Sequence, residues 1–189
     1  MTIVKDGNFL ETKMLSLFAN SAYSPRNETQ NIFDIKAQIA ANQKGVEELV
    51  SVIKNHGIEK NKVLCNELLN QGKKLVQDSI KNIKNGSFAV KLDNEISIAV
   101  LIKNEKKNKK LIIDFKETDS QHESNFNAPS AITKACVLYV LRCLIEDKDI
   151  PLNEGCLFPV EIKIPKNNLL NPSYPAAVVA GNVETSQKI

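Results

Sequence analysis

The sequence predicts an α+β fold, in which an antiparallel helix pair is followed by a β-hairpin, a buried helix and a further strand. Apolar residues recur at three- and four-residue steps between residues 31 and 85, which is the period of amphipathic helices. Between residues 96 and 115 the period changes to two, as in strands with one buried face. A further helical pattern and a further alternating run follow. The chain of 189 residues, 42% of them hydrophobic, is long enough to bury a core.

The helix pair is predicted from two apolar stripes. The first helix should end at His56 and Gly57, which are ordinary stop signals, and the second should run from about residue 60 to Asn85. A short helix is expected over residues 11–19, whereas residues 1–10 show no pattern. The first stripe consists of Ile32, Ile35, Ile39, Val46, Leu49, Val50 and Ile53, and the second of Leu64, Leu68, Leu75, Ser79, Ile80 and Ile83.

The later elements follow from shorter patterns. Residues 96–102 and 110–115 predict the two strands of the hairpin, and a lysine-rich run over residues 103–110 lies between them. We interpret this run as a solvated loop rather than a phosphate-contacting patch, because no arginine or aromatic residue is interleaved. The buried helix should begin near Pro129 and continue to Ile145. Residues 158–164 predict a half-buried strand, and residues 116–127 and 146–156 are expected to be loops.

Composition excludes several classes of protein. The net charge of +3 does not favour nucleic acid as a partner. No stretch approaches the about 20 apolar residues of a membrane span, and no secretory segment is recognised, so the chain is expected to be cytoplasmic. The four cysteines form no C-x-x-C pair and are expected to be reduced and buried. Cys156 could also be a nucleophile, but no histidine lies beside it, which favours a structural role.

No motif in the chain defines a reaction. The only two histidines, His56 and His122, have no second ligand at a metal-binding spacing, so no metal site is expected from this chain alone. The seven glycines form no phosphate-cradling loop, which argues against a self-contained nucleotide site.

The last nineteen residues contain a distinctive pattern. Two prolines hold the chain extended or turned, and residues 176–180 predict an apolar strand or buried segment. Gly181 then permits a positive φ or a close backbone approach. A polar stretch follows that resembles the start of a helix. Because this element has only begun where the sequence stops, residues 1–189 are expected to form a single partial domain, truncated at both ends.

Five ordered blocks resemble the hydantoinase B/oxoprolinase family, most closely the B-type domain of ATP-dependent 5-oxoprolinases. The blocks are Asp34-Ile-Lys-Ala-Gln-Ile-Ala-Ala-Asn-Gln-Lys-Gly45; Asp114-Phe115 with Thr118 and Asn125-Phe-Asn-Ala-Pro129; Tyr139-Val-Leu-Arg142; Ile150-Pro-Leu-Asn-Glu-Gly-Cys156; and residues 171–187. The chain departs from the family pattern where Glu117 and Ser124 replace glycines, Asn167 and Asn168 replace Gly-Ser, and Lys36 replaces an arginine. Histidine and aspartate motifs upstream of this region, and a glycine-rich C-terminal portion, are absent.

The resemblance implies a part of an enzyme of glutathione metabolism that hydrolyses the lactam 5-oxo-L-proline to L-glutamate. A lactam amide is resonance-stabilised, so ATP cleavage is needed to drive its opening. ATP would be bound by an A-type partner subunit or domain, and the remaining B-type segments would be further partners. A divalent metal is possible in the complete enzyme.

The resemblance also marks polar residues that could line a substrate site: Asn125, Asn127, Asn182, Asp114, Gln38 and Asn42. Their amides and carboxylate suit a lactam or a carboxylate ligand. Alternatively, Gln38 and Asn42 brace the helix pair, and Asn127 caps the following helix. Three hypotheses stay open: a subunit of a split lactamase, a non-catalytic remnant or interaction module, and a piece of a hydantoinase B-type subunit acting on hydantoins. The catalytic residues are not identified.

Overall fold

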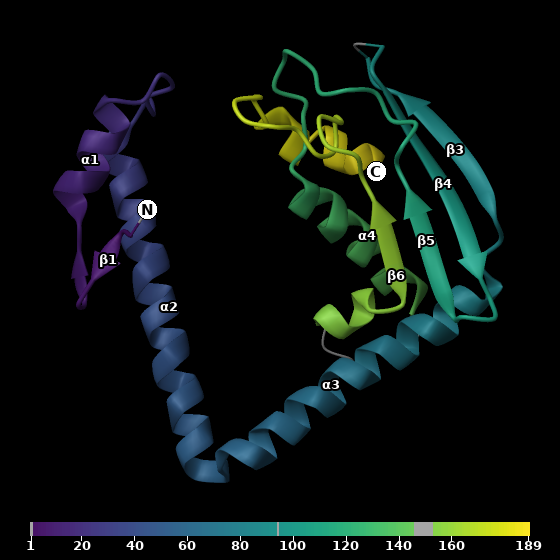
Figure 1. Cartoon of the computed structure of the whole chain (residues 1–189), viewed down its shortest axis with the longest axis horizontal. Helices are drawn as coiled ribbons and strands as arrows, with labels where there is room; N and C mark the ends of the chain where they lie inside the picture. The colour runs from purple at the N-terminus through teal and green to yellow at the C-terminus, as the bar shows by residue number, and fades with distance from the viewer. Residues whose placement is uncertain (1, 94, 146–152) are drawn as a thin grey trace. The chain divides into compact units, whose positions relative to one another are not determined.

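The computed structural model describes residues 2–93, 95–145 and 153–189 (Figure 1). The chain forms two compact units, one ending at Val63 and the other beginning at Leu64, which we call the N-terminal and C-terminal units. Most of the loop predicted over residues 146–156 lies outside the described residues.

The N-terminal unit begins with a small hairpin, although the sequence had suggested no structure there. Strands β1 (Val4–Lys5) and β2 (Asn8–Phe9) pair antiparallel. Asp6 and Gly7 between them have φ of 50° and 79°. The Asp-Gly dipeptide is a recognised signal for such a two-residue turn, and it was overlooked.

Two helices follow in this unit. Helix α1 (Glu11–Ala19) confirms the short helix, and α2 (Glu28–His56) confirms the first long one. The Asn27 side chain caps α2 by accepting a hydrogen bond from the backbone N–H of Gln30 at 3.0 Å. The Lys36 ammonium on α2 forms an ion pair with the Glu11 carboxylate at 2.7 Å, and it lies 5.8 Å from the ring centre of Phe9. The lysine that replaces an arginine thus attaches α2 to the preceding elements.

Helix α3 (Ile58–Ser79) follows Gly57, which ends α2 with a φ of 78°. The second predicted helix is therefore present, but it changes to a 3-10 turn, η1 (Ile80–Asn82), before Asn85. Gly72 and Val76 form its buried face. Gly72 allows close packing, because a Cβ there would lie 2.7 Å from the Asn153 amide oxygen.

A four-stranded sheet organises the C-terminal unit. Its order is β3 (Gly86–Lys91), β4 (Ser97–Glu105), β5 (Lys110–Asp114), β6 (Val160–Lys163). The first two pairings are antiparallel and the last is parallel. Strands β4 and β5 are the predicted hairpin, and β6 is the predicted final strand. Strand β3 was missed, because it is an edge strand with little alternation in burial.

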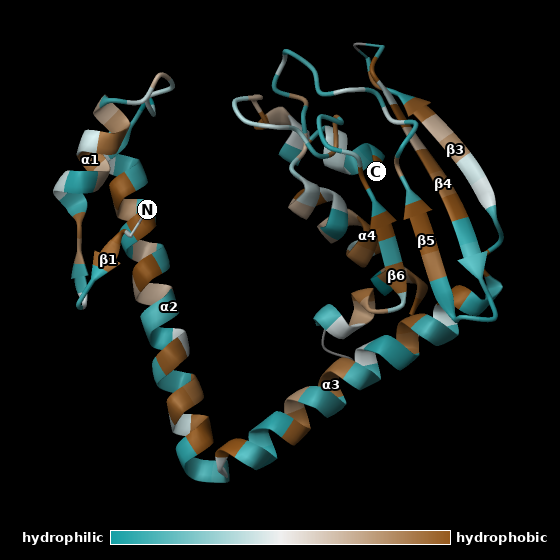
Figure 2. Cartoon of the chain, in the orientation of Figure 1, coloured by the Kyte–Doolittle hydropathy of each residue, from teal (hydrophilic) through white to brown (hydrophobic). Residues whose placement is uncertain are grey.

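One face of this sheet carries the core. Leu111 and Ile113 of β5 point into it, and helix α4 (Ser130–Leu144) covers them through Val137 and Leu141. Figure 2 shows hydrophobic residues along β4 and β5. The opposite face of α4 remains open, since Tyr139 is 70% exposed. The fold class expected from the sequence is confirmed.

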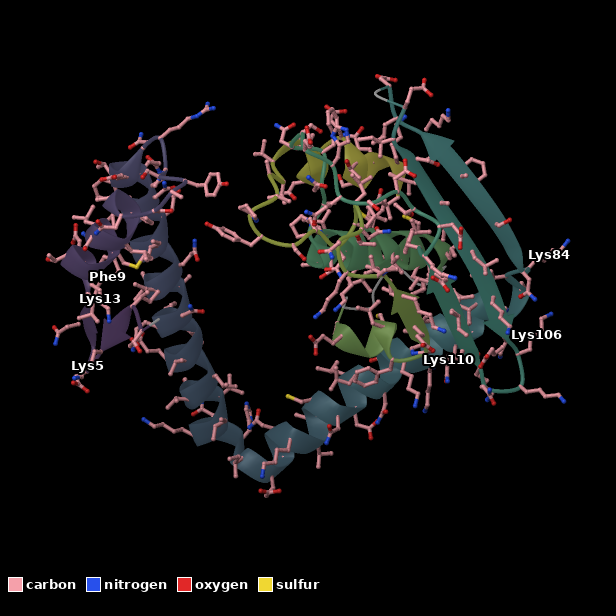
Figure 3. All side chains as sticks on the ribbon, turned by 45° about the horizontal axis from the view of Figure 1, so that its top comes forward. Lys5, Phe9, Lys13, Lys84, Lys106 and Lys110 are labelled. Carbon is pink, nitrogen blue, oxygen red and sulfur yellow. The ribbon has the colours of Figure 1, made fainter. Side chains whose placement is uncertain are left out.

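The structure also tests the expectations for the lysine-rich run, the cysteines and the apolar run near the C-terminus. The lysine-rich run begins in β4, crosses the turn at residues 106–109 and ends at Lys110, the first residue of β5, so only its middle part is a loop. Figure 3 labels Lys106 and Lys110 near this turn. Cys156 is buried, in agreement with a structural role, but Cys65 and Cys143 are exposed, so the expectation of four buried cysteines was wrong. Residues 176–179 form no strand, and none of residues 176–180 is buried, so both interpretations of that run were wrong. No helix in the described part of the chain is long and apolar enough to cross a membrane.

Candidate functional site

The loop that follows β5 is held against the sheet by side-chain bonds to the backbone. The Thr118 hydroxyl donates to the carbonyl of Ala99 at 2.9 Å and accepts from its N–H at 3.0 Å, which continues the pairing of β4. The Asp119 carboxylate accepts from the N–H of Ser97 at 2.7 Å. The amide of Asn168, which is 4% exposed, donates to the carbonyl of Thr118. The loop is therefore an ordered part of the fold.

Asn127 is the centre of this loop. Its side chain is fully buried, and its amide oxygen accepts from the N–H of His122 at 2.7 Å. Its amide nitrogen lies 2.8–2.9 Å from the carbonyl oxygens of His122, Ser124 and Ala177. The alternative of a helix cap is wrong, because Pro129 occupies the N-cap position of α4. The Asn127 amide is occupied by backbone groups and positions the loop, and a substrate-binding role for Asn127 stays a prediction.

The C-terminal segment closes over the same loop. The N–H of Gly181 donates to the carbonyl of Asn125 at 2.9 Å, and the Thr185 hydroxyl donates to the carbonyl of Phe126. A Cβ on Gly181 would lie 1.9 Å from the carbonyl oxygen of Asn127. Gly181 has no positive φ, so close backbone approach explains the glycine. The predicted helical start is present as two 3-10 turns, η3 (Ala180–Asn182) and η4 (Thr185–Lys188).

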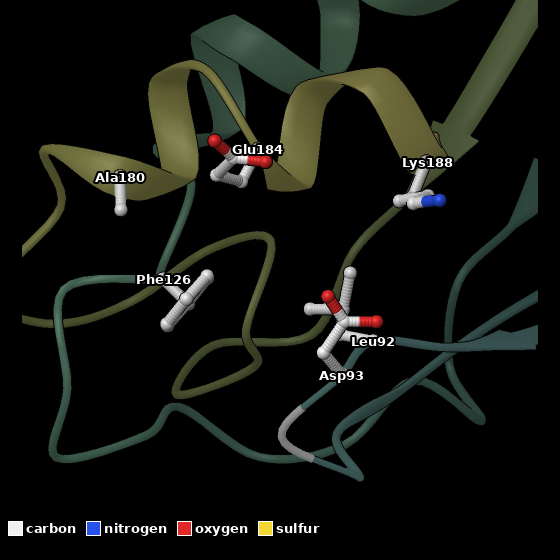
Figure 4. Close-up of a pocket in the computed structure, with 6 residues that line it drawn as sticks. All are labelled: Leu92, Asp93, Phe126, Ala180, Glu184 and Lys188. Carbon is white, nitrogen blue, oxygen red and sulfur yellow. The ribbon is translucent and has the colours of Figure 1, made fainter.

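A pocket of about 660 Å³ opens where these two segments meet the β3–β4 connection (Figure 4). Its apolar lining comes from Phe126, in the loop, together with Leu92 and Ala180. Asp93, Glu184 and Lys188 add two carboxylates and one ammonium. Figure 4 shows Glu184 and Lys188 on the C-terminal turns, across the space from Asp93. The pocket thus offers a small apolar wall together with both signs of charge, which suits a compact polar molecule.

Asn182 lies beside a different groove, of about 480 Å³, between α4 and the C-terminal turns. The Cys136 thiol in this groove donates to the carbonyl of Ser186 at 3.3 Å. Burial raises the pKa of Cys136 above its ordinary value, so the thiol stays protonated and is a poor nucleophile. The groove is lined by Ile132, Ala135, Cys136, Tyr139, Val140, Asn182, Ser186 and Gln187.

The structure brings only part of the predicted residue set together. Asn125 and Asn127 lie in one loop, and the turn containing Asn182 packs on that loop. Asn182 lines the groove beside α4, whereas the pocket beside Phe126 is lined by none of the three side chains. Asp114 lies at the end of β5, where its carboxylate accepts from the N–H of Lys116 at 2.9 Å. Gln38 and Asn42 are exposed on α2 in the N-terminal unit.

The charged residues of the pocket were not foreseen from the sequence. Asp93 and Lys188 belong to no recognisable spacing, and only the fold places them near each other.

Asn167 and Asn168 stand where the family pattern has Gly-Ser, and Asn167 has a φ of 59°. Asparagine tolerates this left-handed conformation better than most residues, which explains how it can replace a glycine.

The side chains that could bind a metal or a nucleotide are dispersed in the described part of the chain. Among residues 2–93, 95–145 and 153–189, no three histidine, cysteine, aspartate or glutamate side chains gather as a metal site would require. The seven glycines are scattered along the sequence. The sequence shows no glycine-rich pattern of the kind that cradles phosphates.

The model of the hydantoinase B/oxoprolinase family matches residues 1–189, and the chain belongs to this family. It is 37% identical over 201 residues to a 5-oxoprolinase of Saccharomyces cerevisiae, covering 99% of this chain. It is 34% identical over 198 residues to a 5-oxoprolinase of Dictyostelium discoideum, covering 100% of this chain. The chain spans 15% of the length of each of these relatives.

A solved structure agrees with this assignment. An ATP-dependent caprolactamase from Pseudomonas jessenii matches 98% of this chain with a TM-score of 0.72 and 17% sequence identity. The match covers 32% of the caprolactamase chain. At this identity the likeness shows the fold alone.

Proposed function

We propose that this chain is part of the B-type chain of an ATP-dependent cyclic-amide hydrolase whose substrate is 5-oxo-L-proline. The observation that carries the proposal is the identity to two 5-oxoprolinases along 99% and 100% of the chain. Because the chain spans 15% of their length, the remaining B-type segments are partners in this proposal. An A-type chain or domain would bind ATP in this proposal, because the sequence here has no glycine-rich phosphate loop.

The pocket beside Asn127 is the proposed substrate-contacting region. Phe126 and Leu92 would cover the methylene edge of the five-membered ring. The Lys188 ammonium would pair with the substrate carboxylate, and a carboxylate of Asp93 or Glu184 would accept the lactam N–H. Asn125 and Asn182 stay proposals as further amide contacts near this region. For Asp114, Gln38 and Asn42 the substrate-binding role also stays a prediction, and none of the three lines the pocket.

A chimeric enzyme tests the proposal. This chain replaces the matching segment of the Saccharomyces cerevisiae 5-oxoprolinase, and glutamate formation from 5-oxoproline is measured with ATP present. An active chimera is expected. Lys188→Met should raise its KM by about 10- to 100-fold, because a hydrogen bond to a charged group contributes about 1.5–3 kcal/mol.

The matched control is Lys107→Met, which removes the same charge from the β4–β5 turn and should leave KM unchanged. A folded chimera without turnover would favour the non-catalytic remnant or interaction module. Turnover of hydantoin in place of 5-oxoproline would favour the hydantoinase B-type alternative. An active chimera with equal KM for both lysine variants would remove the pocket from the proposal while retaining the reaction.

A further inference from the structure

The pocket between the C-terminal turns and the β3–β4 connection contains three charged side chains that the fold leaves unpaired. Within the described part of the chain, Asp93, Glu184 and Lys188 form no ion pair with one another or with any other residue. Elsewhere the chain does pair its charges, as Lys110 and Glu161 show. Unpaired charges of both signs that converge on one cavity are typical of a site for a charged ligand.

The turn that carries Asp93 is held by backbone hydrogen bonds. The N–H of Leu92 donates to the carbonyl of Ile96 at 2.8 Å, and the N–H of Glu95 donates to the carbonyl of Leu92 at 2.9 Å. The Leu92 side chain is 7% exposed and belongs to the core of the C-terminal unit. Asp93 is therefore attached to an ordered turn that the core anchors.

The opposite side of the pocket is equally ordered. Ala180, Glu184 and Lys188 follow one another at four-residue steps. The N–H of Glu184 donates to the carbonyl of Ala180 at 2.7 Å, as in a turn of α-helix, so these side chains share one face. The Thr185 hydroxyl, which donates to the carbonyl of Phe126, attaches this face to the loop. The two sides of the pocket thus present their charges from fixed segments.

The arrangement of groups along the pocket matches an α-amino acid. Figure 4 shows the carboxylates of Asp93 and Glu184 on opposite sides of the space, with Lys188 toward one end and Phe126 and Ala180 toward the other. An ammonium between the two carboxylates can donate to both, because it has three N–H groups. Its neighbouring carboxylate would then pair with Lys188. The side chain of the amino acid would lie against Phe126 and Ala180.

The net charge of the pocket favours a zwitterion over an anion. Two carboxylates and one ammonium give the pocket a charge of −1. A zwitterionic amino acid leaves this charge unchanged, whereas the anion of 5-oxoproline would raise it to −2 and offers one N–H in place of an ammonium. Among the described lining residues, the apolar end has no cation, so a carboxylate in the side chain, as in glutamate, would lack a partner there.

We infer that this pocket binds a free α-amino acid with an uncharged, apolar side chain, whose ammonium is held by Asp93 and Glu184 and whose carboxylate is held by Lys188. Binding follows from the charges and shape of the pocket alone. Its consequence for catalysis rests on the proposed function: an amino acid in this position would exclude 5-oxoproline and act as a competitive inhibitor of the lactam hydrolase.

Ligand-observed NMR titration of the full chain tests the binding, with L-methionine as the probe. L-Methionine should bind more tightly than L-glutamate and more tightly than N-acetyl-L-methionine, whose nitrogen carries no charge. The double variant Asp93→Asn/Glu184→Gln should weaken L-methionine by about 5- to 25-fold, because each exposed ion pair contributes up to about fivefold. The same variant should leave the affinity for N-acetyl-L-methionine unchanged, whereas damage to the fold would weaken both ligands.

The matched control is Glu67→Gln/Glu123→Gln, which removes two exposed carboxylates outside the pocket and should change neither affinity. In the active chimera, L-methionine should raise the KM for 5-oxoproline and leave kcat unchanged, since the two molecules compete for Lys188.

Four results separate this inference from the proposed function. No L-methionine binding to the folded chain, with an active chimera, would overturn the inference and retain the reaction. Binding that the double variant does not weaken would assign L-methionine to another surface. Tighter binding of L-glutamate than of L-methionine would overturn the requirement for an apolar side chain. Binding as expected with an inactive chimera would retain the amino-acid site and overturn the proposed function.

Discussion

The two units of this chain use apolar residues in different ways. In the N-terminal unit, Met14 and Ile32 are the only buried hydrophobic side chains among the described residues. The C-terminal unit buries a continuous cluster that joins the sheet, α3, α4 and the C-terminal turns. Its glycines at positions 72, 155 and 181 lie against other backbone or side-chain atoms, whereas Gly45 of α2 has no atom within 4 Å of a built Cβ. Apolar residues thus recur with similar regularity in the sequences of the two units, but the C-terminal unit buries many more of them.

The largest expected effect is at Gly181. Gly181→Ala would place a Cβ 1.9 Å from the carbonyl oxygen of Asn127, so one of the two backbone segments must shift. The free energy of unfolding of the C-terminal unit should fall by more than about 4 kcal/mol, a loss that few single substitutions cause. Urea unfolding followed by circular dichroism measures this. A variant as stable as the parent would contradict the close approach.

Leucine truncation compares the two units directly. Leu141→Ala removes a side chain that is 2% exposed and should cost about 2–5 kcal/mol through cavity formation. Leu49→Ala, in dilute solution, should change stability by at most about 0.5 kcal/mol, because Leu49 is 57% exposed. Equal losses in urea unfolding would show that α2 packs as fully as α4.

Asn127→Ala is expected to be nearly as damaging as a core truncation. It removes the partner of the His122 N–H and of three carbonyl oxygens, and each buried group left unsatisfied costs about 1–3 kcal/mol. Asn125→Ala, at an exposed neighbouring position, is the control and should be nearly neutral. Thermal unfolding of the two variants distinguishes a positioning residue from a surface amide.

Gly45→Ala should have the opposite sign. Nothing approaches a Cβ at this exposed helical position, so alanine should stabilise α2 by about 0.5–1 kcal/mol. The unfolding midpoint of the N-terminal unit should rise while that of the C-terminal unit stays the same. A lower midpoint would indicate a contact at Gly45 that its open surroundings do not suggest.

The smallest effect concerns pH. The hydrogen bond and charge of Lys110 lower the pKa of Glu161 below its ordinary value of 4.5. A lowered pKa adds stability that is present above 4.5 and is lost as the pH falls through the folded-state value. Glu161→Gln should therefore lower the unfolding midpoint slightly at neutral pH and have no effect in acid. Glu67→Gln, which makes the same change at an exposed position of α3, is the matched control.

Local patterns predicted most of the elements. The helical period from residue 31 predicted α2, and alternation from residue 96 predicted β4 and β5, because these signals are contained within one element. Strand β3 was not predicted from the sequence. It is an edge strand that pairs with β4 alone, so its residues show little alternation between buried and exposed positions. The β1–β2 hairpin was missed although its Asp-Gly turn was visible. Gly57 was correctly recognised as the end of a helix, since a positive φ is a local requirement.

The candidate site was less predictable. The resemblance marked the blocks around Asn127 and Gly181, and the structure places these blocks in contact. It did not indicate that the Asn127 amide is occupied by backbone groups, nor that Asp93 and Lys188 share a pocket. These facts depend on contacts between segments that are distant along the chain.

The sequence by itself determined the family, the fold class and the positions of the long helices and the hairpin, because these follow from motif order and from periods within a few residues. Only the tertiary structure decided why Gly181 is a glycine, which amides are buried and which charges meet in a cavity. The physical reason is that close approach, burial and electrostatic pairing are properties of two segments in space, and neither segment alone carries the information.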